Sequence, residues 1–446
     1  MTKVLLVSPP YYKPYSDGQY VADSAPIGLG YVASYALSKL DVDIKLVDYG
    51  IEQYSDIKWA DLLDEYKPDV VGFNTLTLGF QQVIKMARLS KSLSKAMLVS
   101  GGAHSTIKPE ELLSVCDVAV QGEGEQTFVE VLQGKRLFDI SGICFKFKDM
   151  VIHNPERERI SDLDSLPFPA YDLMPFDKYK GWGVIGSRGC PFVCDFCESP
   201  VLWHRIMKLR SPKNIVDEIE LLYRKYSVNH VLFEDDTFNL TPKRGIDICD
   251  ELINRELGIT FAVQMRANKE CVSEQLLSKM KQAKCVETLF GVETGSKKVM
   301  ESMNKNLSID EASQAIQLAH KSGIKHVKGY FMVGNWNESI KDILKTWRFI
   351  IGNPVDTVLT VCTPLPSTEF DRKLRLNGYI DKVDWSKVNW VTPLSRTDKL
   401  SQRSIQFMYY LTVIFIHFPA HVFRGGNTKG LFKGIWNFVA NKIRGR

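Results

Sequence analysis

The sequence predicts an α/β protein with two successive sheets of mainly parallel strands, followed by a helical C-terminal region. Short apolar runs alternate with amphipathic stretches along most of the 446 residues, which is typical of parallel sheets covered by helices. The apolar fraction of 44% and the charged fraction of 24% are those of ordinary globular domains. A proline-punctuated stretch, 163–172, separates two such β/α regions. We therefore expect a doubly wound N-terminal domain and a partial (β/α)6 barrel of the TIM type.

The length corresponds to about three domains. We expect a doubly wound domain over 1–135, a linker over 136–180, a barrel over 181–370 and a helical region over 371–446 that ends in a basic amphipathic tail.

In the N-terminal third, apolar runs predict strands at 4–8, 44–48, 70–74, 97–101 and 118–121, and a helix from about 27 to 40. Ligands of doubly wound sheets bind at the carboxyl ends of the strands. The loops expected there are 8–10, 74–78, 101–104 and 122–125. The glycine-rich ones allow the backbone to approach a ligand closely.

The linker contains two β-rich runs, 143–147 and 150–153, that could pair as a hairpin. The stretch 163–172 is predicted to be extended because proline disfavours the helical conformation of the residue before it.

Six further apolar runs predict the barrel strands, at 182–185, 230–237, 259–266, 288–293, 327–333 and 358–363. Charged residues stand at or just after the carboxyl ends of three of them, where catalysis is expected in such barrels. These residues are Asp235, Asp236, Arg266 and Glu293.

Three cysteines, Cys190, Cys194 and Cys197, stand at C-x3-C-x2-C spacing directly after the first barrel strand. Soft thiolates favour iron–sulfur clusters, zinc or copper(I). A [4Fe–4S] cluster usually has four cysteine ligands, so three would leave one iron open for a substrate. The alternative is a structural zinc site with His204 as the fourth ligand, although we expect His204 to lie at a helix start.

The cysteine motif, with Phe196 before its last cysteine, resembles the cluster loop of radical S-adenosylmethionine (SAM) enzymes. The resemblance implies that the three cysteines hold a [4Fe–4S] cluster, that SAM chelates the open iron, and that Phe196 lies beside the adenine. The stretch 233–238 is similar to the strand motif that approaches the SAM amino group, which involves Asp235 and Asp236. The stretch 291–296 resembles the strand that places Glu293 on the ribose, and Arg266 lies where a polar contact to SAM is common.

The stretches 26–31, 101–104 and 122–125 resemble the flavodoxin- or Rossmann-like cobalamin-binding domain that precedes many radical SAM domains. The Asp-x-His-x-x-Gly signature that supplies a histidine to cobalt is absent, so the resemblance implies cobalamin without that ligand. His104 is predicted either to touch the cofactor or to hydrogen-bond within its loop, and a domain that binds no corrin is the alternative. The implied contacts are Pro9, Gly28, Asn74, Gly101, Gly102, His104, Gly122 and Glu123.

The resemblance implies an enzyme that cleaves SAM reductively and functionalises an unactivated carbon, most simply by methyl transfer from cobalamin. The alternative is cyclisation, rearrangement or dehydration without net methylation, as in the anaerobic magnesium-protoporphyrin ester cyclase group. A flavodoxin or ferredoxin is implied as electron donor. A non-enzymatic alternative is a zinc-stabilised or corrinoid-binding regulatory module.

The net charge of +5 is too small to imply a nucleic-acid partner. The N-terminus lacks a signal-peptide layout, and the scattered cysteines are expected to be free, buried thiols, so we expect a cytoplasmic protein. The apolar run 405–418 is short for a membrane span and is expected to be a buried packing helix. The stretch 431–443 combines an apolar face with lysine and arginine, which favours either peripheral contact with anionic lipid and a lipid-like substrate, or a helix that caps the barrel.

Overall fold

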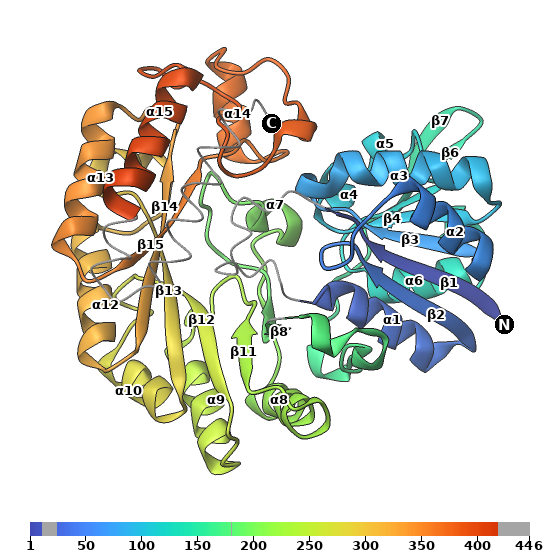
Figure 1. The fold of residues 1–446 in the computed structure, drawn as a ribbon, viewed down its shortest axis with the longest axis horizontal. Coiled ribbons are helices and arrows are strands. Elements are labelled where there is room, and N and C mark those ends of the chain that lie inside the picture. Colours follow the sequence, from blue (N-terminus) through green and yellow to red (C-terminus); the bar gives the residue numbers. More distant parts are fainter. Residues whose placement is uncertain (11–24, 180, 418–446) are drawn as a thin grey trace.

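The structure is a computed structural model, and it describes residues 1–10, 25–179 and 181–417. Figure 1 shows two α/β bodies side by side, one formed by the N-terminal third and the other by the barrel. The N-terminal sheet has seven strands in the order β2-β1-β3-β4-β5-β6-β7, and the first five are parallel. Its strands are β1 (Thr2–Ser8), β2 (Val42–Asp48), β3 (Val70–Asn74), β4 (Met97–Gly101), β5 (Val118–Val120), β6 (Ile143–Phe147) and β7 (Met150–His153).

Helices cover this sheet as a doubly wound fold requires. They are α1 (Ile27–Lys39), α2 (Asp56–Tyr66), α3 (Phe80–Leu93), α4 (Ala103–Ile107), α5 (Pro109–Leu112) and α6 (Gly124–Leu132). The five predicted strands and the helix over about 27–40 are all present.

The predicted hairpin forms, but it belongs to the N-terminal sheet and not to the linker. Strand β6 pairs antiparallel with β5, with Ile143 opposite Val120. Lys148 and Asp149, at the turn, have φ of 48° and 65°, the left-handed pair that a two-residue hairpin loop needs. The physical reason is that β5 would otherwise leave an unpaired sheet edge.

The second sheet has six strands, all parallel, in the order β15-β14-β13-β12-β11-β8. This is the predicted partial (β/α)6 barrel. Its strands are β8 (Trp182–Val184), β11 (His230–Phe233), β12 (Thr260–Arg266), β13 (Cys285–Glu293), β14 (His326–Val333) and β15 (Asp356–Val361). The helices outside it are α8 (Pro212–Tyr226), α9 (Pro242–Asn254), α10 (Glu274–Gln282), α11 (Lys297–Ser302), α12 (Ile309–Lys321) and α13 (Ile340–Gly352).

The helical region after the barrel comprises α14 (Glu369–Leu376), α15 (Gln402–Thr412) and a π-helical turn, η8 (Val413–His417). Ile405, Met408 and Tyr409 of α15 are buried, as expected of a packing helix. Among the described residues, none of the helices combines the length and the hydropathy of a transmembrane span. The predicted amphipathic stretch 431–443 lies outside the described residues.

A buried polar network holds the two bodies together. Arg210, just before α8, forms an ion pair with Glu218 of that helix, and both side chains are at most 3% exposed. Arg210 also donates to Ile185 O at 2.9 Å and to the hydroxyl of Tyr31 of α1 at 3.1 Å. Tyr171 of the linker donates to Glu218. The ion pair of Arg210 and Glu218 therefore connects the N-terminal body, the linker and the barrel.

Candidate functional site

Residues between β8 and the first cysteine fix the conformation of the loop that carries the three cysteines. Gly189 has φ of 99°, and a Cβ there would lie 2.3 Å from Ile206 O, so only glycine fits. The carboxylate of Asp235, after β11, accepts from Gly186 N at 2.6 Å and from Ser187 Oγ at 2.7 Å. Asp235 was predicted to contact SAM, but both of its carboxylate oxygens accept hydrogen bonds from the start of the cysteine loop. This gives Asp235 a positioning role.

Each cysteine sulfur has a polar neighbour. Cys190 Sγ lies 3.7 Å from the hydroxyl of Thr237, and Cys197 Sγ accepts from Ser199 N at 3.4 Å. Arg266 Nη1 lies 3.5 Å from Cys194 Sγ. Hydrogen bonds to cysteine sulfur tune iron–sulfur clusters, so the environment of the loop fits thiolate ligands.

The structure does not support His204 as the fourth ligand of a zinc site. His204 has φ of 49° and ends the short helix α7 (Ser199–Trp203) where a helix start was expected. Its side chain is 58% exposed and lies 3.5 Å from Glu156. Within the described ranges, no three His, Cys, Asp or Glu side chains are gathered around one possible metal ion. A [4Fe–4S] cluster does not require that convergence, because each thiolate binds a different iron.

Arg266 is fully engaged around the cysteine loop. Its Nε donates to Asn268 at 2.8 Å, and its Nη2 donates to the carbonyl of Lys305. Its guanidinium carbon lies 3.5 Å from the ring centre of Phe192, a cation–π contact inside the cysteine motif. The arrangement fixes a positive charge beside Cys194, where an anionic cluster or the SAM carboxylate would be stabilised.

Glu293 is aimed by an irregularity at the end of β13. The pairing with β14 shifts between Gly291 and Glu293, and Glu293 has φ of 71°. Its carboxylate accepts from Lys305 Nζ at 2.7 Å, and both side chains are 7% exposed. Lys305 Nζ in turn lies 5.5 Å from the ring centre of Phe196. Sequence reasoning missed Lys305, because nothing in its local pattern marks it as the partner of a residue on another element.

If Glu293 holds the SAM ribose, Glu293→Gln should raise the SAM dissociation constant. A hydrogen bond to a charged group contributes about 1.5–3 kcal/mol, so we expect a loss of roughly ten- to 150-fold in equilibrium dialysis. Glu301→Gln is the control, because Glu301 is 67% exposed and forms only a surface pair with Lys297. Equal SAM affinity in both variants would remove Glu293 from the binding site.

A cavity of about 340 Å³ lies beside Cys197, and we call it the cysteine-side cavity. Phe196 lines it, together with Met332 at the end of β14. Asp236 lines it as well and accepts from Ser199 Oγ at 2.6 Å. Burial raises the pKa of the Asp236 carboxyl. The cavity is completed by Cys197, Glu198, Ser199, Leu202, Trp203, Thr363, Leu365 and Trp390.

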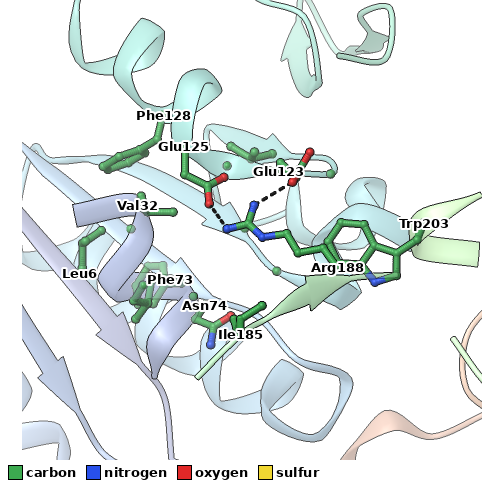
Figure 2. Close-up of a pocket in the computed structure, with 18 of the residues that line it drawn as sticks. Leu6, Val32, Phe73, Asn74, Glu123, Glu125, Phe128, Ile185, Arg188 and Trp203 are labelled. Atoms are coloured by element: carbon green, nitrogen blue, oxygen red, sulfur yellow. Dashed lines mark hydrogen bonds and ion pairs between the residues drawn. The ribbon is translucent and has the colours of Figure 1, made fainter. Parts of the chain in front are cut away.

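A second cavity, of about 290 Å³, lies between the ends of the N-terminal strands and the loop after β8 (Figure 2). We call it the N-terminal cavity. Its inner wall is apolar, and Leu6, Val32, Phe73 and Phe128 lie together there. Six of the eight residues predicted to contact cobalamin line it, namely Gly28, Asn74, Gly101, Gly102, Gly122 and Glu123.

Pro9 and His104 are not among the residues that line this cavity. His104 is fully buried, lies 3.2 Å from the hydroxyl of Thr77 through Nδ1, and packs on Phe80 with ring centres 4.3 Å apart. Burial lowers the pKa of His104 to about 4, so the imidazole is neutral at pH 7. Of the two roles left open for His104, the structure supports hydrogen bonding within the N-terminal body.

Arg188, between β8 and the cysteines, was also missed. It points from the short strand β9 (Ser187–Arg188) into the N-terminal cavity and donates to Glu123 at 2.7 Å and to Glu125 at 2.6 Å (Figure 2). Its side chain is 10% exposed. Its two partners lie more than 60 residues away in the sequence, so no local pattern marks Arg188 as their cation. Arg188 thereby joins the cysteine loop to the N-terminal body.

Comparisons with known proteins agree with this architecture. The model of the Radical SAM superfamily matches residues 184–350, and the model of the B12 binding domain matches residues 18–132. An uncharacterized methyltransferase of Pyrococcus horikoshii is 30% identical over 420 residues, which cover 90% of each chain. The anaerobic magnesium-protoporphyrin IX monomethyl ester cyclase of Rubrivivax gelatinosus is 28% identical over 421 residues, 90% of this chain and 74% of the cyclase.

Among solved structures, the cobalamin-dependent S-adenosylmethionine radical enzyme OxsB superposes with a TM-score of 0.74 at 17% identity. The match covers 93% of this chain and 66% of the OxsB chain, so it supports the fold. The chain belongs to the radical SAM superfamily, in the group that carries an N-terminal B12-binding domain.

Proposed function

We propose that this protein is a cobalamin-dependent radical SAM methyltransferase that acts on an apolar small molecule. The observation that carries the proposal is that Trp203 and Asp236 line both cavities. The two cavities are therefore adjacent, and we infer that a group held in the N-terminal cavity faces a substrate held beside the cysteines.

Cys190, Cys194 and Cys197 would hold a [4Fe–4S] cluster, and SAM would lie in the cysteine-side cavity. Phe196 and Met332 offer apolar surface for an adenine, and Glu293 with Lys305 offers the polar contact for a ribose. When bound, the reduced cluster supplies the electron that cleaves SAM, and cobalamin supplies a methyl group. Electrons would come from a flavodoxin or ferredoxin.

The N-terminal cavity suits the cobalamin in two respects. Its glycines have no side chains, so a large flat ligand can approach the backbone at the ends of the strands. The Arg188 guanidinium, held by Glu123 and Glu125, supplies hydrogen-bond donors at the rim. The protein's own residues would orient the ligand and exclude water from the region around Asp236, which lines both cavities.

With SAM on Phe196 and Met332, the apolar side chains that remain in the cysteine-side cavity include Leu202, Leu365 and Trp390, and these support a hydrophobic substrate. Cyclisation or rearrangement without methylation is the second candidate, because the cyclase of Rubrivivax gelatinosus matches 90% of this chain.

The test is anaerobic reconstitution followed by iron, sulfide and corrinoid analysis, with SAM products measured by mass spectrometry. About four irons per chain, bound cobalamin and dithionite-dependent 5′-deoxyadenosine are expected. Accumulation of S-adenosylhomocysteine together with 5′-deoxyadenosine indicates methyl transfer, and 5′-deoxyadenosine alone indicates the second candidate. Zinc in place of iron would overturn both.

Gly28→Phe should block cobalamin binding without disturbing the fold. Gly28 lines the N-terminal cavity, and a Cβ there meets no atom within 4 Å, so a phenyl group would fill the ligand space. We expect at least about a tenfold drop in bound corrinoid, equivalent to ~1.4 kcal/mol. Gly352→Phe is the control, because Gly352 also has open space but lies at the end of α13. Undiminished corrinoid in Gly28→Phe would argue that the cofactor binds elsewhere.

A further inference from the structure

The neighbouring helices α13, α15 and η8 carry six exposed apolar side chains. The six side chains are between 45% and 71% exposed. The helices lie next to each other on the outside of the barrel (Figure 1), and Trp347 of α13 donates to the hydroxyl of Thr412 at 2.8 Å, which ties them together. We call these residues the helical patch: Ile340, Leu344, Ile351, Phe407, Ile414 and Phe415.

The patch follows helical spacing and is not a scatter of single residues. Ile340, Leu344 and Ile351 recur at intervals of four and seven along α13, which places them on one side of that helix. Phe407, Ile414 and Phe415 recur at seven and eight along α15 and η8. Exposed apolar residues that gather on one surface mark interaction sites, whereas isolated ones need no explanation.

The exposed charges that α13 and α15 themselves carry are of one sign. The exposed charged side chains of α13 and α15 are all cationic, namely Lys341, Lys345, Arg348 and Arg403. Asp342, the acid of α13, is buried and is paired with Lys345 at 3.2 Å. From Lys399 to the end of the sequence there is no Asp or Glu, and there are eight basic residues, Lys399, Arg403, Arg424, Lys429, Lys433, Lys442, Arg444 and Arg446.

The positive charge of these helices distinguishes between the partners that the helical patch could bind. A second copy of the same face would bring cations against cations, and the chain's own residues 418–446 are equally basic. An anionic lipid surface offers both an apolar layer for the phenylalanines and negative charge for the lysines and arginines. We propose that the helical patch docks the protein on an anionic membrane surface, with Phe407 and Phe415 inserted among the lipids.

Flotation of the full-length protein with vesicles tests this surface without any cofactor, so its outcome is separate from that of the proposed function. The vesicles are phosphatidylcholine alone or phosphatidylcholine mixed with phosphatidylglycerol. We expect flotation only with the anionic vesicles, and its loss near 1 M salt, where the Debye length falls to about 3 Å.

The variant Phe407→Glu/Phe415→Glu should lower the vesicle partition coefficient by at least about tenfold. Removing the cations in Lys341→Gln/Arg348→Gln/Arg403→Gln should lower it by roughly fivefold for each charge. The matched control is Ile57→Glu/Leu376→Glu, which alters two side chains that are 74% and 71% exposed on α2 and α14, and it should float like the wild type. Formation of 5′-deoxyadenosine in solution should be equal in all of them.

Unchanged flotation of the phenylalanine variant would overturn the proposal, because the contact would then lie elsewhere. Equal flotation with neutral vesicles would overturn it as well. Self-association in sedimentation that the phenylalanine variant abolishes, without vesicle binding, would assign the helical patch to a second copy of the chain.

Discussion

Cys194→Ala is expected to abolish reductive SAM cleavage. Cys194 is 8% exposed, and its loss removes one of the three proposed cluster ligands, while the guanidinium of Arg266, 3.5 Å from its sulfur, is a cation and cannot replace a thiolate. We expect 5′-deoxyadenosine formation to fall at least about 10³-fold, roughly 4 kcal/mol in activation free energy. The iron content per chain should fall with it.

The control is Cys249→Ala, since Cys249 is a free, fully buried thiol of α9 that lies outside the cysteine loop. That variant should keep its iron and its turnover, and lose only stability. Retention of both iron and turnover by Cys194→Ala would contradict the assignment of the cluster ligands.

Arg210→Met should destabilise the folded protein by about 3–5 kcal/mol, because it leaves the Glu218 carboxylate buried without its cation. Glu218 is fully buried and its other partner is the hydroxyl of Tyr171. The free energy of unfolding in urea measures the effect. The same substitution removes the hydrogen bond to Tyr31 of α1, so cobalamin retention should fall in parallel.

Arg224→Met on α8 is the matched control. Arg224 also pairs with a glutamate of its own helix, Glu220, but is 64% exposed, and an exposed pair of this kind contributes only ~0.3–0.5 kcal/mol. The double variant Arg210→Met/Glu218→Met should recover most of the stability, because it removes the stranded charge. Equal effects of Arg210→Met and Arg224→Met would show that the buried network does not anchor the two bodies.

Much of the fold follows from local patterns. The apolar runs that predict strands correspond to β1–β5, to the β6–β7 hairpin and to the six barrel strands, and Ser211 caps α8 by accepting from Asn214 N. The hairpin was predicted in the linker and lies in the N-terminal sheet, because the run 143–147 shows that a strand forms and not which sheet edge it joins. Which strands pair when they are distant in sequence depends on which sheet edge is still unpaired.

The candidate site divides in the same way. The cysteine loop and the bare glycines of the N-terminal cavity are visible in the sequence, because each function resides in residues adjacent along the chain. Lys305 and Arg188 are not visible, since their partners lie 12 residues or more than 60 residues away. For Asp235 the local pattern predicted a ligand contact, because the residue stands at a strand end. In the structure its carboxylate instead accepts hydrogen bonds from Gly186 and Ser187.

The two α/β bodies, the three-cysteine loop and its resemblance to radical SAM enzymes are readable from the amino-acid order, because periodicity, glycine placement and thiolate spacing are local properties. Three features emerge from the folded chain: His104 does not line the N-terminal cavity, Arg188 connects the two bodies, and Asp236 and Trp203 line both cavities. These are contacts between elements distant in sequence, and packing alone brings them together.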